Sequence, residues 1–161
     1  MESVNQAAGE VVFTRVVTRQ ARNTRRPTAD RLASYVDPHV SASMVARTEA
    51  LGLDSSKLVR LLAELNDNDS RGNAYAAHAL LRAVLDHIPP LLGCSDFKAA
   101  ASNYSWSRTD KSYARRLLDL KLQADDALHR QISKRTDHPG IDDMPPKIWV
   151  NRTLQECAEA P

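Results

Sequence analysis

The sequence predicts an all-α fold, a bundle of five to six helices that follows a basic N-terminal arm. From residue 39 onward, apolar residues recur at the three- and four-residue spacing of amphipathic helices. Two Phe, two Trp, four Tyr and five Gly are too few for an all-β domain with glycine-rich turns. The 161 residues, 42% of them hydrophobic, are enough for one domain with a buried core. We therefore expect an arm over residues 1–38 and a helical bundle domain over residues 39–161.

The predicted arm is loosely ordered and rich in arginine. Its short apolar run, Val11-Val12-Phe13, is typical of a strand or of a segment that joins a sheet edge. Two interpretations stay open for the arm, a solvated tail without a partner and a segment that contacts phosphates. The planar guanidinium fork suits phosphate oxygens. The candidate nucleic-acid-binding residues are Arg15, Arg19, Arg22, Arg25 and Arg26.

The first two helices of the bundle are predicted from their caps. Ser41 or Ser43 can cap a short helix that reaches Ala50 and ends before Gly52. A second helix, capped by Ser55 or Ser56, carries four leucines at helical spacing, namely Leu58, Leu61, Leu62 and Leu65. The Asn- and Asp-rich stretch 66–72 predicts a break after this helix. This stretch lacks the sixth-position Gly and the closing Glu of a calcium loop, so it predicts no calcium site.

Four further helical segments complete the predicted bundle. The third helix runs from Asn73 to about His87, where Pro89 and Pro90 stop it, and a short helix covers residues 96–103. The longest helix opens at Thr109 or Asp110 and reaches about Lys134. Its apolar residues form two stripes, which predicts the central member of the bundle. A loop over 137–146 precedes a last helix over 147–158.

Polar residues four apart mark the third helix, at His78, Arg82 and Asp86. At this spacing they lie one above the next, and Arg82 can pair with Asp86. His87 falls in the last turn, where the helix dipole favours a protonated imidazole. One interpretation makes Arg82 and His87 catalytic residues. The other is an ion pair on a half-buried face, with His87 at the helix end.

Asp125 and His129 stand one turn apart on the longest helix. A carboxylate in this position fixes the tautomer of an imidazole and stabilises its charged form, as acid–base catalysis requires. Alternatively, His129 is a partly buried bundle residue that only bonds Asp125. We expect the third and the longest helices to lie side by side with their polar residues in a shared groove. The candidate catalytic residues are Arg82, His87, Asp125 and His129.

Several pieces of the sequence occur in an order known from one family. They are Leu62-Ala63-Glu64-Leu65-Asn66, the stretch ALLRAVLDHIPP over 79–90, Asp96-Phe97, Ala124-Asp125 and Leu128-His129. On these pieces, residues 57–158 resemble the HEPN-like helical bundles (higher eukaryote and prokaryote nucleotide-binding). The resemblance is to small prokaryotic proteins of phage-defence and toxin modules. It implies the fold of about 100 residues and leaves residues 1–56 outside.

The resemblance also implies an activity. Catalytic members of the family are metal-independent RNases whose signature is Arg, four to six residues and His, completed by a second copy across a homodimer. Arg82 and His87 fit this spacing, as do Arg71 and His78, although Ala83 stands where Asn commonly follows the Arg. The family chemistry would make His87 or His129 the general acid or base, let Arg82 stabilise the phosphorane charge and let Asp125 orient His129.

Other function classes lack their motifs in the sequence. It has no P-loop, no G-x-G-x-x-G, no H-E-x-x-H and no G-x-S-x-G. It also lacks the paired Glu-x-x-His motifs of di-iron bundles, so we expect neither a metal nor a cofactor. Cys94 and Cys157 have no paired spacing, which argues against a disulfide scaffold and a cysteine-based zinc site.

Partners and location are expectations of the same kind. A net charge of +2 does not demand nucleic acid, and only the arginine-rich arm suggests it. We expect a homodimer with RNA or a protein as partner. The alternative to an RNase is a non-catalytic binding or dimerisation module, such as an antitoxin-like regulatory subunit. The N-terminus lacks the layout of a signal peptide, and no apolar run approaches the roughly 18–20 residues of a membrane span, which predicts a cytoplasmic protein without membrane contact.

Overall fold

The computed structural model describes residues 33–131 and 139–161, and this part of the chain is helical throughout, without a strand. Its elements are α2 (Pro38–Ala50), α3 (Ser56–Arg71), α4 (Ala74–His87), η1 (Pro89–Leu92), α5 (Phe97–Asn103), α6 (Arg108–His129), η2 (Ile141–Asp143) and α7 (Lys147–Glu159), where η marks a short 3₁₀ helix. The predicted all-α class is confirmed for these residues. None of their helices combines the length and apolarity needed to cross a membrane.

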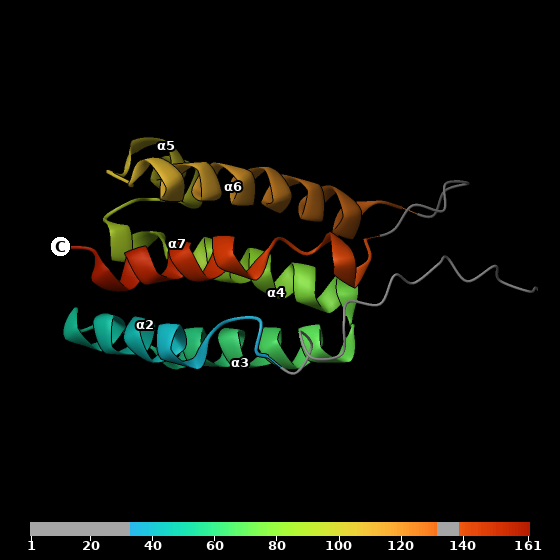
Figure 1. Cartoon of the computed structure of the whole chain (residues 1–161), viewed down its shortest axis with the longest axis horizontal. Coiled ribbons are helices and arrows are strands. Elements are labelled where there is room, and N and C mark those ends of the chain that lie inside the picture. The colour runs from blue at the N-terminus through green and yellow to red at the C-terminus, as the bar shows by residue number, and fades with distance from the viewer. Residues whose placement is uncertain (1–32, 132–138) are drawn as a thin grey trace, which may run out of the picture.

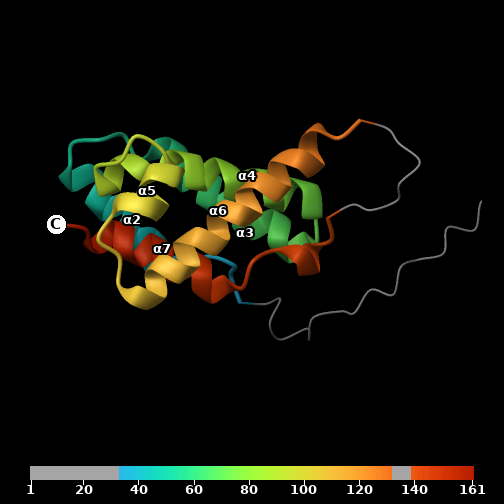
Figure 2. The same cartoon turned by 90° about the horizontal axis from the view of Figure 1, so that it is seen from above.

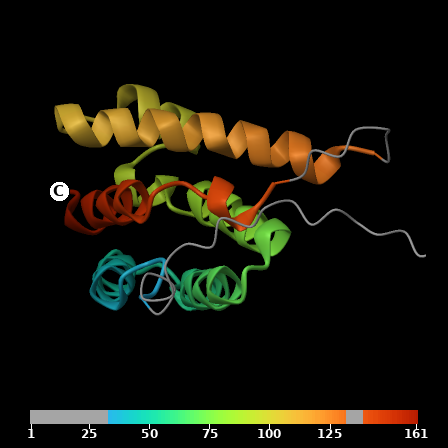
Figure 3. The same ribbon diagram turned by 45° about the vertical axis from the view of Figure 1, so that its right-hand side comes forward.

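The helices lie in three layers (Figure 1). One outer layer holds α2 and α3, the middle layer holds α4 and α7, and the other outer layer holds α5 and α6. Figure 3 shows the same stacking from another side. Between layers, α3 packs on α4, α2 packs on α7, and α6 packs on both α4 and α7. The core lies on both faces of the middle layer, where Val84, Leu85, Val150 and Leu154 are almost completely buried.

The longest helix, α6, belongs to an outer layer, so the prediction of a central helix was wrong. Its buried residues form a single stripe, at Asp110, Ala114, Leu117 and Ala124. Leu122, from the second predicted stripe, is 59% exposed. α6 also stops at His129 rather than near Lys134, because Arg130 already has extended backbone angles. The rest of the predicted extension lies within 132–138, outside the described residues.

The predicted break over 66–72 was also wrong, because α3 continues through it to Arg71. Asn and Asp favour turns, but here tertiary contacts outweigh that preference. The Asn66 side chain accepts a hydrogen bond from Val36 N (2.7 Å) and donates one to Val36 O (3.1 Å). The helix ends at Arg71, and the next residue, Gly72, has a φ of 73°, the left-handed conformation that glycine adopts easily.

The other helix ends follow their caps. α2 begins at Pro38, before the expected Ser41, because the Asp37 carboxylate accepts a hydrogen bond from His39 N at 2.7 Å. α4 ends at His87, ahead of Pro89 and Pro90, as predicted. α5 and α7 also match their predicted segments closely, whereas the predicted loop 137–146 contains the short helix η2.

Two residues that the sequence analysis assigned to the arm belong to the core. Tyr35 and Val36 are fully buried. The Tyr35 hydroxyl donates to Pro145 O at 2.7 Å, and the Asn151 side chain donates to Tyr35 O at 2.9 Å. These contacts attach the chain before α2 to α7. Residues 1–32, which include the rest of the predicted arm, lie outside the described residues.

An ion pair between the half-exposed Arg152 and the buried Asp110 fixes the start of α6 against α7. Arg152 donates to both carboxylate oxygens of Asp110, at 3.1 and 3.0 Å, and the Ser107 hydroxyl donates to the same carboxylate at 2.6 Å. Burial raises the pKa of Asp110, but the hydrogen bonds from Arg152 and Ser107 outweigh burial and leave this pKa below its usual value. The position of α6 over the middle layer is thus set at its N-terminal end by charge and further along by the Leu117 stripe.

Candidate functional site

The contact between α4 and α6 brings three of the four candidate catalytic residues together. Arg82 of α4 places Nη2 3.0 Å from Oδ1 of Asp125 on α6. His129, one turn further along α6, places Nε2 3.4 Å from the same oxygen. The prediction that these two helices lie side by side is confirmed, and Figure 2 shows α6 running across α4.

The ion pairs continue along the two helices as a ladder of five residues, Asp86, Lys121, Arg82, Asp125 and His129. Lys121 Nζ lies 3.1 Å from Asp86 Oδ1, and Arg82 Nε lies 4.0 Å from Asp86 Oδ2. The side chain of His129 is 76% exposed, more than that of any other member of the ladder, whereas the side chain of Lys121 is only 18% exposed. The imidazole is therefore the member of the ladder that solvent or a large ligand reaches most easily.

His87, the fourth candidate, lies elsewhere. A separation of five residues turns a side chain by about 140° around a helix, so His87 and Arg82 leave α4 in different directions. His87 borders a cavity of about 290 Å³ together with Asp54, Leu58 and Pro90. Burial lowers the pKa of His87, Lys57 lowers it further, and Asp54 acts in the opposite direction. The structure therefore does not join His87 to the ladder.

The second pair that fits the Arg–His spacing is also divided. Arg71 pairs with Asp67 at 2.8 Å on the exposed surface of α3. His78, on α4, is only 8% exposed and its Nε2 lies 3.3 Å from Gly140 O. The arginines Arg15, Arg19, Arg22, Arg25 and Arg26 lie outside the described residues.

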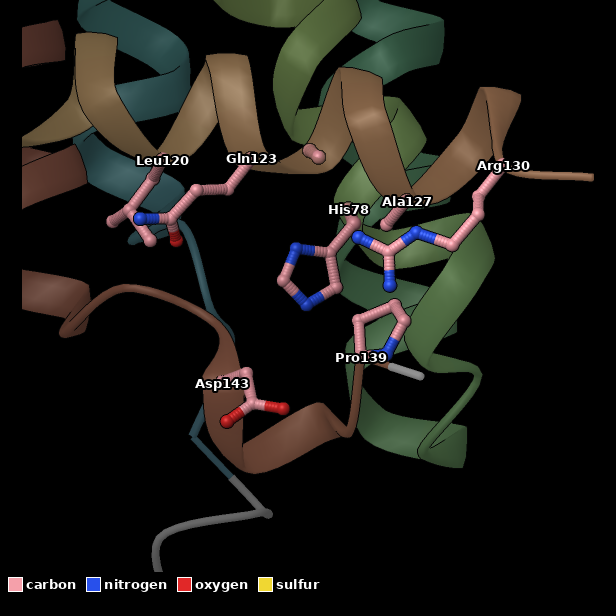
Figure 4. Close-up of a pocket in the computed structure, with 8 residues that line it drawn as sticks. His78, Leu120, Gln123, Ala127, Arg130, Pro139 and Asp143 are labelled. Atoms are coloured by element: carbon pink, nitrogen blue, oxygen red, sulfur yellow. The ribbon is translucent and has the colours of Figure 1, made fainter. Parts of the chain in front are cut away.

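On the other flank of α6 from the ladder, a cavity of about 510 Å³ separates this helix from the segment around η2. Figure 4 shows the His78 ring pointing into this cavity, with Arg130 and Gln123 from α6 on either side of it and Asp143 of η2 across from it. Apolar side chains complete its wall, namely Leu120, Ala124, Ala127 and Pro139. We call this space the His78 cavity.

Most residues of this cavity were not predicted from the sequence. His78 was predicted only as a member of the polar row with Arg82 and Asp86. Gln123, Ala127 and Arg130 recur at spacings of four and three on α6, which places them on one face, and this signal was present in the sequence. The contribution of Asp143 had no such signal, because it depends on how the segment after residue 138 returns to α4 and α6.

The ladder has the arrangement of an oriented acid–base group. His129 Nε2 lies 3.4 Å from Asp125 Oδ1, at ion-pair distance and without hydrogen-bond geometry. A carboxylate beside Nε2 favours the tautomer with its proton on that nitrogen, which leaves Nδ1 as a proton acceptor. Within residues 33–131 and 139–161, no three His, Cys, Asp or Glu side chains gather as metal ligands would.

Comparisons with known proteins assign no family. None of the protein-family models matches the chain, and neither the curated proteins nor the solved structures give a match. The resemblance to HEPN-like bundles therefore stays a prediction from the sequence. A functional proposal has to rest on the geometry of α4 and α6.

Proposed function

We propose that the chain is a HEPN-like, homodimeric, metal-independent RNase of a phage-defence or toxin system. The observation that carries this proposal is the ladder, in which Asp125 holds an exposed His129 and is itself held by Arg82 (3.4 and 3.0 Å). Among the four histidines that the structure describes, His129 alone is paired with a carboxylate in this way. An oriented and accessible imidazole is the group that RNA cleavage without a metal requires.

The chemistry follows from the free nitrogen of His129. As a general base, Nδ1 removes the proton from a ribose 2′-hydroxyl, whose oxygen then attacks the adjacent phosphorus. The P–O5′ bond breaks, and the leaving oxygen takes a proton from an acid. Asp125 stabilises the imidazolium formed in the first step. Arg82 acts as a positioning residue through Asp125.

Acid and base are two separate groups in this reaction, and each copy offers one paired imidazole in its described part. A second copy supplies the other, which is the reason for proposing a homodimer. In this proposal the arm arginines hold backbone phosphates on either side of the scissile bond.

The test uses the full chain with labelled single-stranded RNA in excess EDTA. Wild type cleaves the RNA, and His129→Ala lowers the rate by about 10²-fold or more, the usual contribution of a general acid or base. His39→Ala is the matched control, because His39 is an exposed imidazole on α2 without a carboxylate partner in the ladder. Intact RNA at high protein concentration, over several RNA sequences, contradicts the proposal.

A second function, a non-catalytic RNA- or protein-binding module, is favoured by the separation of His87 from Arg82 and by the carboxylates that engage Arg82. In that case the ladder only fixes α6 to α4. The same RNA would be bound without cleavage, and replacing the five arm arginines with Gln in the full chain would weaken binding and flatten its salt dependence. Unchanged binding in that variant would exclude a role for the arm.

A further inference from the structure

A second cavity lies at one end of the bundle, where the ends of α2 and α4 meet the start of α3 and the short helix η1 (Figure 1). It is the space of about 290 Å³ that His87 borders, and we call it the His87 cavity. At about 30 Å³ for each water-sized group, it holds roughly ten non-hydrogen atoms. We propose that the His87 cavity binds a small primary amine with an apolar body, in its ammonium form. The proposed RNase does not use this cavity, so the inference goes beyond that function.

The wall of the His87 cavity is mostly apolar and runs from the core to the surface. Leu58 and Ile88 are almost completely buried, whereas Leu53 is 44% exposed. The other apolar members of the wall are Pro90 and Leu91. An apolar body that covers these side chains removes hydrocarbon surface from water, which favours binding in proportion to the area covered. A ligand without such a body would leave this wall exposed to water.

The charged residues of the lining favour a cation. They are Asp54 and Asp86, and no Lys or Arg is among the described residues that line the cavity. Asp86 is already paired with Lys121 at 3.1 Å. Asp54 accepts hydrogen bonds from Ser56 N (2.9 Å) and Ser56 Oγ (2.8 Å), which hold the pKa of its carboxyl below the usual value without neutralising its charge. Asp54 is therefore the ionised group that can pair with a ligand cation.

The imidazole of His87 offers an acceptor to the same ligand. Its ring is partly buried, and no hydrogen bond from the described residues reaches it. Burial and the nearby charge of Lys57 lower the pKa of His87 against the smaller effect of Asp54, so the ring is neutral at neutral pH. A neutral imidazole has one unprotonated nitrogen, which accepts a hydrogen bond from an N–H donor such as an ammonium group.

The end of α4 adds a further preference for positive charge. Pro89 and Pro90 have no N–H, so the carbonyl oxygens of Leu85 and Asp86 lack the donors that a continuing helix would supply. The negative end of the helix dipole lies at the same turn and favours a cation there. The carboxylate, the imidazole and this helix end thus favour an ammonium group, while the apolar wall favours a hydrocarbon body attached to it.

Titration calorimetry of the full chain at neutral pH with 2-phenylethylamine, 2-phenylethanol and 3-phenylpropionate tests the proposal. The three compounds share an apolar body and differ in the charge of the head group. We expect saturable binding of the amine, about tenfold stronger than that of the alcohol, and the weakest binding for the carboxylate. Absence of saturable binding for the amine, or equal binding of amine and alcohol, overturns the proposal.

Variants locate the binding. Leu53→Trp should fill the cavity and abolish amine binding, whereas Leu51→Trp is the matched control, because Leu51 is 43% exposed and does not line the cavity. Asp54→Asn should weaken amine binding about fivefold and leave alcohol binding unchanged, while Asp67→Asn, at an exposed carboxylate on α3, should change neither.

Thermal unfolding without ligand shows whether each variant folds, and Asp54→Asn keeps the proposal testable if Leu53→Trp does not. Amine binding that persists in the folded cavity variants, or that falls equally in the two controls, places the amine elsewhere and contradicts the proposal. All four positions lie outside the ladder, so RNA cleavage is a separate measurement and either proposal can fail alone.

Discussion

The two flanks of α6 are built from the same pair of helices and differ in how their side chains meet. On one flank, the long side chains of Arg82 and Lys121 reach the carboxylates of Asp125 and Asp86 and fill the surface with ion pairs. On the other, Gln123, Ala127 and Arg130 of α6 line a cavity that faces the segment around η2. One turn of α4 separates His78 from Arg82, yet His78 lies in the cavity and Arg82 in the ladder.

Both flanks depend on the buried stripe of α6 that lies between them. Leu117 is fully buried against the middle layer, and Leu122, five residues further along α6 and outside the stripe, is 59% exposed. Leu117→Ala should lower the free energy of unfolding by about 3 kcal/mol, because it removes buried methyl groups and leaves a void. Leu122→Ala is the matched control and should change it by less than about 0.5 kcal/mol. Urea denaturation measures the free energy of unfolding of both variants. Equal losses would show that Leu117 does not face the core and that α6 does not pack on the middle layer as described.

The ion pair at the start of α6 should have the next largest effect on stability. Arg152→Ala leaves the buried Asp110 carboxylate with Ser107 alone, so we expect a loss of about 2 kcal/mol in the free energy of unfolding at pH 7. Because the Arg152 side chain is half exposed, this loss in unfolding free energy is smaller than the loss from breaking a fully buried ion pair.

The pH dependence of that effect has a defined sign. The pKa of Asp110 is lowered in the folded chain, so its ionised form contributes stability above the unfolded pKa of the carboxyl, and this contribution is lost as the pH falls through the folded pKa. The difference between wild type and Arg152→Ala should therefore shrink in acid, measured by denaturation at pH 7 and in steps below pH 4. A difference that grows in acid would contradict the role given to Asp110.

The ladder should contribute little to stability. Arg82 and Asp125 are each about one-third exposed, so Arg82→Ala should cost less than about 1 kcal/mol in unfolding free energy. If the ladder is catalytic, the same variant lowers RNA cleavage far more than it lowers stability. A loss of several kcal/mol would show that the ladder is chiefly a structural connection between α4 and α6.

Filling the cavity should have the smallest effect on the fold. Ala127→Leu adds a side chain to its apolar wall, and we expect a change of less than about 1 kcal/mol in unfolding free energy because the space is partly open. The variant should keep RNA cleavage. Loss of cleavage would mean that the two flanks of α6 do not act separately.

These contrasts also show how far the sequence was informative. Apolar spacing, caps and the Pro89-Pro90 pair predicted most helices, because these signals are local. The predicted break in α3 was wrong because the Asn66 side chain is hydrogen-bonded to Val36, thirty residues away. Tyr35 was assigned to the arm but belongs to the core, because it is hydrogen-bonded to Pro145 and Asn151, which are more than one hundred residues away. Local spacing correctly paired Asp125 with His129, whereas the link from Asp125 to Arg82 needed the packing of α4 on α6. The place of Asp143 in the wall of the His78 cavity depends on how the segment around η2 packs on α4 and α6, and no spacing of residues in the sequence predicts that packing.

The central claim is that the functional imidazole is His129 in the ladder rather than His87, although His87 has the sequence spacing to Arg82. Cleavage rates of labelled RNA by His129→Ala and His87→Ala, measured side by side in EDTA, test this claim most directly. The account predicts that His87→Ala cleaves at the wild-type rate and that His129→Ala is slower by about 10²-fold or more. Loss of cleavage in His87→Ala with full activity in His129→Ala would contradict it.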